Sequence, residues 1–236
     1  MSGSRIDNYY DEQYSSSQHG DNWIKLPFNR VDYYGLPLRR LGCKKGERLL
    51  DIACGNGQFL HRAESLGLQC YGIDISGVAI EKARELCKAD MVCSDVNDGL
   101  PYKENFFDYV TCLGSLEHFE KQTYILSEIR RVTKPSGQIY IFVPNKDYFL
   151  HKFGYETDFQ PVVNRYSFLG YKELLIKSGL VIERVFCDNS HISDLDRTSS
   201  WLKLILKLMA HLFVRFIPLR YSYSFIFICK PATEKE

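Results

Sequence analysis

The chain has 236 residues, which suffices for one domain with a large hydrophobic core and argues against a second full domain. Its 30 basic and 29 acidic residues leave a formal net charge of +1. This balance excludes a strong positive field over the whole protein, so we expect no nucleic-acid partner unless a local basic patch provides a site.

Eight cysteines lie along the chain, at positions 43, 54, 70, 87, 93, 112, 187 and 229. They show no CxxC pair and several fall inside predicted strands, so we predict reduced, buried thiols in place of disulfides or a metal site. Residues 1–20 have neither the basic start nor the apolar core of a secretory signal. We therefore expect a cytoplasmic protein.

Residues 1–42 precede the first predicted strand and form an N-terminal cap segment. Residues 1–20 are rich in Ser, Tyr, Asp and Gln and have no apolar period, which predicts a loose segment in the free protein. Residues 21–42 place aromatic side chains around two prolines. We expect an irregular or short helical stretch there that packs on the domain.

The stretch ERLLDIACGNGQF, residues 47–59, predicts a strand, a tight turn and the start of a helix. Gly55 and Gly57 allow a positive φ or the close approach of a ligand, because neither has a Cβ. The next apolar run ends at Asp74, where a carboxylate can accept hydrogen bonds from ribose hydroxyls. The pattern therefore predicts a nucleoside pocket.

The turn must be assigned either to a dinucleotide or to S-adenosylmethionine. A dinucleotide fingerprint, GxGxxG, has its third glycine where this chain has Leu60. Asp51 lies just before the turn, where it would repel a pyrophosphate and attract the amino group of a methionine moiety. These residues favour the cationic sulfonium cofactor.

The motif DIACGNG resembles the first motif of the class I S-adenosylmethionine-dependent methyltransferases, an acidic residue followed by xGxG. Three later segments, VCSDVNDGLPY, FDYVTCLGSLEHF and RVTKPSGQIYIFVPN, continue the resemblance in the right order, which is more specific than one glycine turn. Within that family the chain is similar to small-molecule enzymes of the methyltransferase 11/23 and quinone-pathway O-methyltransferase groups. The resemblance implies that the cofactor is held by Asp51, Ala53, Cys54, Gly55, Asn56, Gly57, Asp74, Ile75, Asp95, Val96, Leu113, Gly114 and Ser115.

Predicted strands and helices alternate through the methyltransferase domain, residues 43–236. We expect strands at 48–52, 69–73, 91–93, 107–112 and 138–143, and helices at 58–66, 77–88 and 120–132, with Ser76 as an N-cap. RYSFLGYKELLIKSGL then predicts a helix and LVIERVFCD a sixth strand. Alternation of this kind predicts an α/β fold with a mostly parallel sheet and helices on both faces. The resemblance adds a Rossmann-like sheet of seven strands whose last strand, in SYSFIFICK, is antiparallel.

Residues 145–165 form an excursion rich in aromatic residues, directly after the fifth predicted strand. Open α/β sheets bind ligands above the carboxyl ends of their strands, so we predict substrate recognition, with an ordinary surface insertion as the alternative. The resemblance also implies that the cap segment closes over the cofactor, with Tyr9, Tyr10 and Tyr14 as candidates. A hydrophobic brace away from the site is the alternative.

A basic, apolar helix is predicted in WLKLILKLMAHLFVRFIP, within an insertion at 190–220. Lys203, Lys207, His211 and Arg215 recur every four residues and form one stripe. Because these polar groups are spread along the helix, we expect residues 201–217 to lie on an anionic membrane surface and not to span it. Packing against the sheet or a dimer interface are the alternatives. The localisation we expect is therefore cytoplasmic and peripheral at the membrane.

Glu117 and His118, in LGSLEHF, are the nearest candidates for a general base. An imidazole titrates near neutral pH, so His118 is the predicted catalytic residue, and a role in shaping the cofactor pocket is the alternative. Quinone-pathway O-methyltransferases have a metal-binding glutamate two residues before LEH, where this chain has Gly114. We therefore predict no metal.

The function predicted from these patterns is S-adenosylmethionine-dependent methyl transfer to a small-molecule or lipid- or glycan-linked acceptor, at oxygen. A catalytically silent S-adenosylmethionine-binding partner subunit is the alternative, because the motifs report binding and not chemistry. A nicotinamide oxidoreductase is disfavoured by the missing third glycine.

Overall fold

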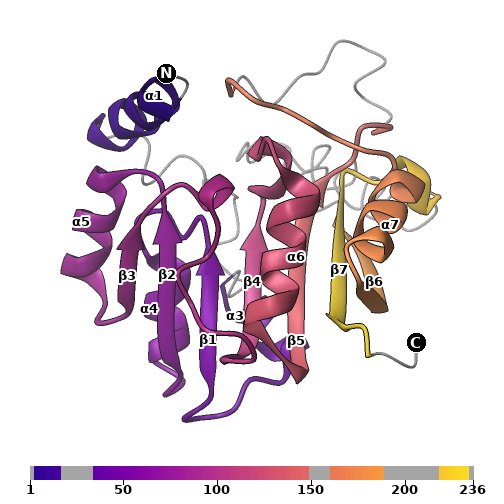
Figure 1. Ribbon diagram of the computed structural model, residues 1–236, viewed down its shortest axis with the longest axis horizontal. Helices are drawn as coiled ribbons and strands as arrows, with labels where there is room; N and C mark the ends of the chain where they lie inside the picture. The colour runs from indigo at the N-terminus through magenta and orange to yellow at the C-terminus, as the bar shows by residue number, and fades with distance from the viewer. Residues whose placement is uncertain (1–2, 17–33, 149–159, 189–217, 234–236) are drawn as a thin grey trace, which may run out of the picture.

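The computed structural model describes residues 3–16, 34–148, 160–188 and 218–233. Within these ranges seven strands form one sheet in the order β3-β2-β1-β4-β5-β7-β6. The strands are β1 (Arg48–Ile52), β2 (Gln69–Asp74), β3 (Asp90–Cys93), β4 (Phe107–Leu113), β5 (Thr133–Pro144), β6 (Leu180–Asp188) and β7 (Ser224–Pro231). Strands β1 to β5 are parallel, and β7 runs antiparallel between β5 and β6 (Figure 1). The predicted Rossmann-like methyltransferase sheet is confirmed.

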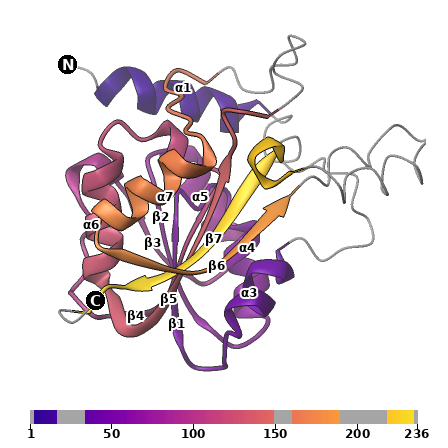
Figure 2. The same cartoon turned by 90° about the vertical axis from the view of Figure 1, so that its right-hand side faces the viewer.

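Helices cover both faces of the sheet. Their bounds are α1 (Gly3–Ser15), α3 (Gly35–Leu41), α4 (Gln58–Glu64), α5 (Gly77–Leu86), α6 (Gln122–Val132) and α7 (Phe168–Lys177). One core joins α6 and α7 to the sheet, and a second core joins α3, α4 and α5 to the opposite face (Figure 2). Strands β1 and β4 are buried between these two layers, which explains their nearly continuous apolar runs.

Helix α5 illustrates how the local sequence sets the element. Ser76 is its N-cap, and the Ser76 hydroxyl accepts a hydrogen bond from the Ala79 amide, as predicted. Ala79, Ile80 and Ala83 recur at helical spacing and are buried against the sheet. The N-terminus of α5 is therefore fixed beside the carboxyl end of β2, where Asp74 lies.

The prediction of a loose N-terminal segment is wrong for residues 3–15, because these residues form helix α1. Ile6, Tyr10 and Tyr14 recur at a spacing of four and line the cavity, and the helix also docks through polar groups. Asp11 Oδ1 accepts hydrogen bonds from the Ser76 hydroxyl at 2.5 Å and from the Val78 amide at 3.2 Å, and Lys82 Nζ donates to the Tyr14 carbonyl oxygen. Figure 1 shows α1 above α5, beyond the carboxyl ends of β3 and β2.

Other predictions need smaller corrections. Strand β5 begins at Thr133, five positions before the predicted start at 138, and its register with β4 shifts between Phe107 and Tyr109. The thiols of Cys93 and Cys187 are exposed, since these residues lie on the two outermost strands, whereas Cys54, Cys70, Cys87, Cys112 and Cys229 are buried. Among the described ranges, no helix has the length and apolar character needed to cross a membrane. The predicted helix at 201–217, residues 190–217 of the predicted insertion at 190–220, and residues 149–159 of the excursion lie outside those ranges.

Candidate cofactor and active site

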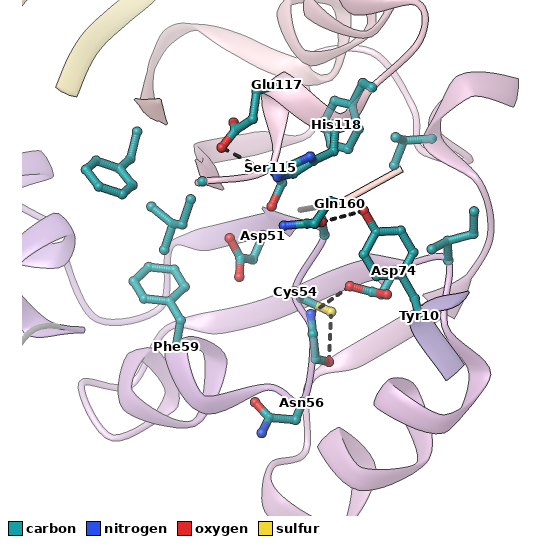
Figure 3. A pocket seen from close by; sticks show the side chains of 18 of the residues that line it. Tyr10, Asp51, Cys54, Asn56, Phe59, Asp74, Ser115, Glu117, His118 and Gln160 are labelled. Carbon is teal, nitrogen blue, oxygen red and sulfur yellow. Dashed lines mark hydrogen bonds and ion pairs between the residues drawn. The ribbon is translucent and has the colours of Figure 1, made fainter. Parts of the chain in front are cut away.

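A cavity of about 360 Å³ opens at the carboxyl ends of the parallel strands, under helix α1. Its walls come from the turns after β1, β2, β3 and β4, from α1, and from residues 160–165. In Figure 3 Asn56 and Cys54 lie at one end, Glu117 and His118 at the other, and Asp51 between them. The cavity therefore lies where open α/β sheets bind their ligands.

The turn after β1 leaves room for another group to come close to its backbone. Gly55 has a φ of +53°, and a Cβ on it would lie 2.6 Å from the Tyr14 hydroxyl oxygen. Any side chain at this position would therefore strain the backbone and collide with α1. Glycine lets the turn, the hydroxyl of Tyr14 and a ligand share one narrow space.

Asp74 ties two turns together with one buried carboxylate. Its Oδ2 accepts a hydrogen bond from the Gly55 amide at 2.8 Å, and its Oδ1 accepts one from the Ser76 amide at 2.9 Å. Burial raises the pKa of Asp74, and the two amide bonds oppose that rise. Each carboxylate oxygen has a second lone pair, so both can also accept a ligand hydroxyl.

Asp51 is a second buried carboxylate on the same cavity, with only 3% of its surface exposed. The Thr111 hydroxyl donates to Asp51 Oδ1 at 2.6 Å. Burial, with a further contribution from Asp74, raises the pKa of Asp51 to about 7, against the opposing effect of the Thr111 hydrogen bond. Two buried acids of this kind favour a cationic ligand, which would restore the ionised form of Asp51.

His118 lies at the other end of the cavity, in the 3-10 turn Leu116–His118 after β4. Its Nδ1 lies 2.7 Å from the Val162 carbonyl oxygen, and its Nε2 lies 3.7 Å from Glu117 Oε1. A carbonyl oxygen only accepts, so Nδ1 carries the proton and Nε2 carries the lone pair in the neutral ring. The tautomer is therefore the one in which Nε2 can accept a proton.

Comparison with known proteins agrees with this geometry. Residues 50–141 match the model of a methyltransferase domain. Norajmaline N-methyltransferase of Rauvolfia serpentina is 36% identical over 105 residues, covering 42% of this chain and 36% of that protein. The 27-O-demethylrifamycin SV methyltransferase of Amycolatopsis mediterranei is 35% identical over 121 residues, covering 47% and 43%. The crystal structure of Haemonchus contortus phosphoethanolamine N-methyltransferase 2 in complex with S-adenosyl-L-methionine superposes with a TM-score of 0.67 at 18% identity, covering 95% and 60%.

Residues 50–141 of this chain are therefore similar to a methyltransferase domain. The chain spans about two fifths of the length of the two curated relatives above. S-adenosylmethionine is the cofactor of this domain, and the cavity fits it on three counts. The cavity has buried acids for a cation, lone pairs on Asp74 for ribose hydroxyls, and the apolar side chains of Ile75 and Val96 for an adenine ring.

The structure brings the predicted cofactor residues of the methyltransferase domain together, with one exception. All of them line the cavity except Gly57. Gly57 is the N-cap of α4 with a φ of +78°, and a Cβ on it would lie 2.8 Å from the Ala83 Cβ. Gly57 therefore allows α4 to pack closely against α5. Asp95 lines the cavity and also caps the next turn, because its Oδ1 accepts from the Asn97 amide at 2.8 Å.

Several cavity residues of the methyltransferase domain were missed by the sequence analysis. The walls also include residues from the N-cap of α3, from α4, β5 and β6, and from the turn before β7, namely Tyr34, Phe59, Phe142, Asp188 and Tyr223. They lie far apart in sequence, so no motif joins them. Among the three candidate tyrosines, Tyr10 and Tyr14 line the cavity and Tyr9 does not. Gln160 and Arg165 of the predicted substrate excursion also reach it.

Proposed function

We propose that this protein transfers the methyl group of S-adenosylmethionine to an oxygen of a small-molecule, lipid-linked or glycan-linked acceptor that enters the cavity beside His118. The observation that carries this proposal is the placement of a buried acidic pair, Asp51 and Asp74, in one cavity with an imidazole. The acids suit a cationic cofactor, and the imidazole suits an acceptor that must lose a proton.

The chemistry asks little covalent help from the protein. When bound, S-adenosylmethionine supplies an electrophilic methyl carbon, and its sulfur departs as a neutral thioether. Asp51, Asp74 and the turn at Gly55 hold the cofactor, while the aromatic walls and helix α1 exclude water and orient the acceptor. His118 Nε2 receives the proton of the acceptor hydroxyl as the new carbon–oxygen bond forms, and Glu117 Oε1, 3.7 Å away, favours the resulting imidazolium.

The choice of oxygen rests on His118. The relatives do not decide the reacting atom, because one is named for an N-methyltransferase and another for a 27-O-demethyl substrate. A neutral amine can attack with its own lone pair and lose its proton afterwards, whereas an alcohol or phenol needs a base during attack. An imidazole held with its lone pair at Nε2 therefore supports an oxygen acceptor. The membrane contact of residues 201–217 remains a proposal from the sequence alone.

The test is to incubate the protein and isotopically labelled S-adenosylmethionine with cell extract, and to profile lipids and polar metabolites separately. We expect a labelled O-methyl product with the wild-type protein and at most about 1% of it with Asp74→Asn. Label on nitrogen or carbon would overturn the oxygen assignment. Cofactor binding without any labelled product, across lipid and polar fractions, would instead favour the silent partner subunit.

A further inference from the structure

The orientation of His118 depends on a backbone carbonyl that is distant in sequence. The Val162 carbonyl accepts from His118 Nδ1 across 44 positions of the chain. This carbonyl belongs to residues 160–165, the last part of the excursion, which we name the strap. A contact that holds the strap against the Leu116–His118 turn therefore also keeps the proton on His118 Nδ1.

Two groups join the strap to that turn. The Asn164 amide donates to the Glu117 carbonyl oxygen at 2.7 Å. Gln122 Nε2 donates to the Leu116 carbonyl oxygen at 2.8 Å and to the Asn164 carbonyl oxygen at 3.2 Å. One side-chain amide thus bonds to both sides of the junction on which His118 is held.

We propose that Gln122 is a positioning residue for His118: its amide NH2 clamps the strap to the 116–118 turn and so holds the Val162 carbonyl against His118 Nδ1. This inference rests on the proposed function, in which His118 Nε2 accepts the proton of the acceptor. Gln122 acts through His118 and the strap, and the described contacts assign it no direct part in binding the cofactor.

The chemistry of the junction explains why a glutamine stands there. Both partners are carbonyl oxygens, so the side chain must present two N–H donors on one atom. A hydroxyl offers one donor, an ammonium would be a buried charge, and asparagine is one methylene shorter. Gln122 is 5% exposed, and its Oε1 has no hydrogen-bond partner within the described ranges. An apolar residue would avoid that cost but would leave the Leu116 and Asn164 carbonyl oxygens without this donor, so the amide serves the junction between the turn and the strap.

The test reads the tautomer of His118 and needs neither cofactor nor acceptor. Protein labelled with 15N-histidine is examined by long-range 1H–15N correlation, and the His118 signals are assigned by their loss in His118→Gln. In the wild type we expect the Nδ1–H tautomer with a slowly exchanging proton. In Gln122→Met, which keeps the length of the side chain, we expect a mixture of tautomers and at least about tenfold faster exchange of that proton.

The matched control is Gln138→Met. Gln138 Nε2 donates to Glu183 Oε2 at 3.3 Å in the middle of β5, and Gln138 does not line the cavity. We expect this variant to keep the wild-type His118 signals. A wild-type His118 spectrum in folded Gln122→Met would overturn the proposal. If Gln122→Met does not fold, the His118 spectrum of Gln122→Asn decides in the same way, because asparagine keeps the amide on a side chain that is one methylene shorter.

A second measurement separates this inference from the proposed function. The affinity for S-adenosylhomocysteine is expected to stay within about twofold of wild type in Gln122→Met. Absence of cofactor binding or methyl transfer in the wild type would contradict the proposed function and leave the His118 spectrum as it is. An unchanged spectrum with normal turnover would contradict only the role of Gln122.

Discussion

The two ends of the cavity are held by different means. At the cofactor end, Asp74 binds the amides of Gly55 and Ser76, which lie 19 and 2 positions away in sequence. At the acceptor end, His118 and Gln122 bind strap carbonyls 44 and 42 positions away, and Tyr10 reaches Gln160 across 150. The first end is set by one βαβ unit, whereas the second exists only when distant segments meet. We therefore expect binding of the donor and selection of the acceptor to be separable.

His118→Gln should break the acceptor end while leaving the cofactor end intact. General base catalysis contributes roughly 10²- to 10⁴-fold, so we expect kcat with the identified acceptor to fall by about 10³-fold. The affinity for S-adenosylhomocysteine, measured by calorimetry, should not change. Near-normal turnover would reduce His118 to a residue that only shapes the pocket.

Asp74→Asn should break the cofactor end. Each oxygen of Asp74 accepts from a backbone amide, so an asparagine must place its NH2 against one of these donors. The variant loses a charge-assisted hydrogen bond and places the asparagine NH2 against a backbone N–H. We expect a cost of about 2.7 kcal/mol, which raises the dissociation constant of S-adenosylhomocysteine about 100-fold. Asp90→Asn is the control, because Asp90 is an exposed carboxylate at the start of β3. Equal affinities in the two variants would contradict the role of Asp74.

The pH dependence of cofactor binding sharpens the role of the acidic pair. Burial raises the pKa of Asp51 to about 7, so Asp51 is protonated below that pH in the cofactor-free protein. A cationic cofactor prefers the carboxylate, and its affinity should fall about tenfold for each pH unit below 7. Calorimetry between pH 5.5 and 8 measures this slope. The slope should vanish in Asp51→Asn, and a flat wild-type profile would contradict the prediction.

The raised pKa of Asp51 also makes stability depend on pH. Stability falls as the pH rises, whereas the affinity for the cofactor rises. The folded state binds the Asp51 proton more tightly than the unfolded chain, where the pKa is 3.8. The free energy of unfolding of the cofactor-free protein therefore falls as the pH rises from about 4 to 7. Asp51→Asn removes this loss, and we expect its Tm at pH 8 to exceed that of the wild type. A lower Tm would mean that Thr111 and its neighbours stabilise the carboxylate more than burial destabilises it.

The sequence predicts the two ends unequally, for physical reasons. Asp51, Gly55 and Asp74 lie at or just after the carboxyl ends of β1 and β2, so period and turn chemistry predicted a βαβ unit with a nucleoside pocket, and the family resemblance added the antiparallel last strand and the set of cofactor residues. The hydrogen bonds by which Asp11 docks helix α1 on α5 leave no apolar pattern in the sequence, so this docking was not predicted. Gln122 carried no signal either, since its two carbonyl partners are brought together by tertiary structure alone.

Tyr10→Phe tests whether the two ends communicate, and its expected effect is the smallest. The Tyr10 hydroxyl donates to Gln160 Oε1 at 2.7 Å, which links α1, where it lines the cavity, to the strap that contacts His118 (Figure 3). The phenylalanine keeps the ring and removes one hydrogen bond, worth about 1 kcal/mol, so we expect the dissociation rate of S-adenosylhomocysteine to rise about fivefold. Tyr124→Phe, on the outer face of α6, is the control, because 44% of Tyr124 is exposed. If only the cofactor rate changes and the His118 signals stay as in the wild type, α1 covers the donor independently of the strap. If the His118 proton also exchanges faster, the closure of α1 over the cofactor and the orientation of His118 are coupled through the hydrogen bond between Tyr10 and Gln160.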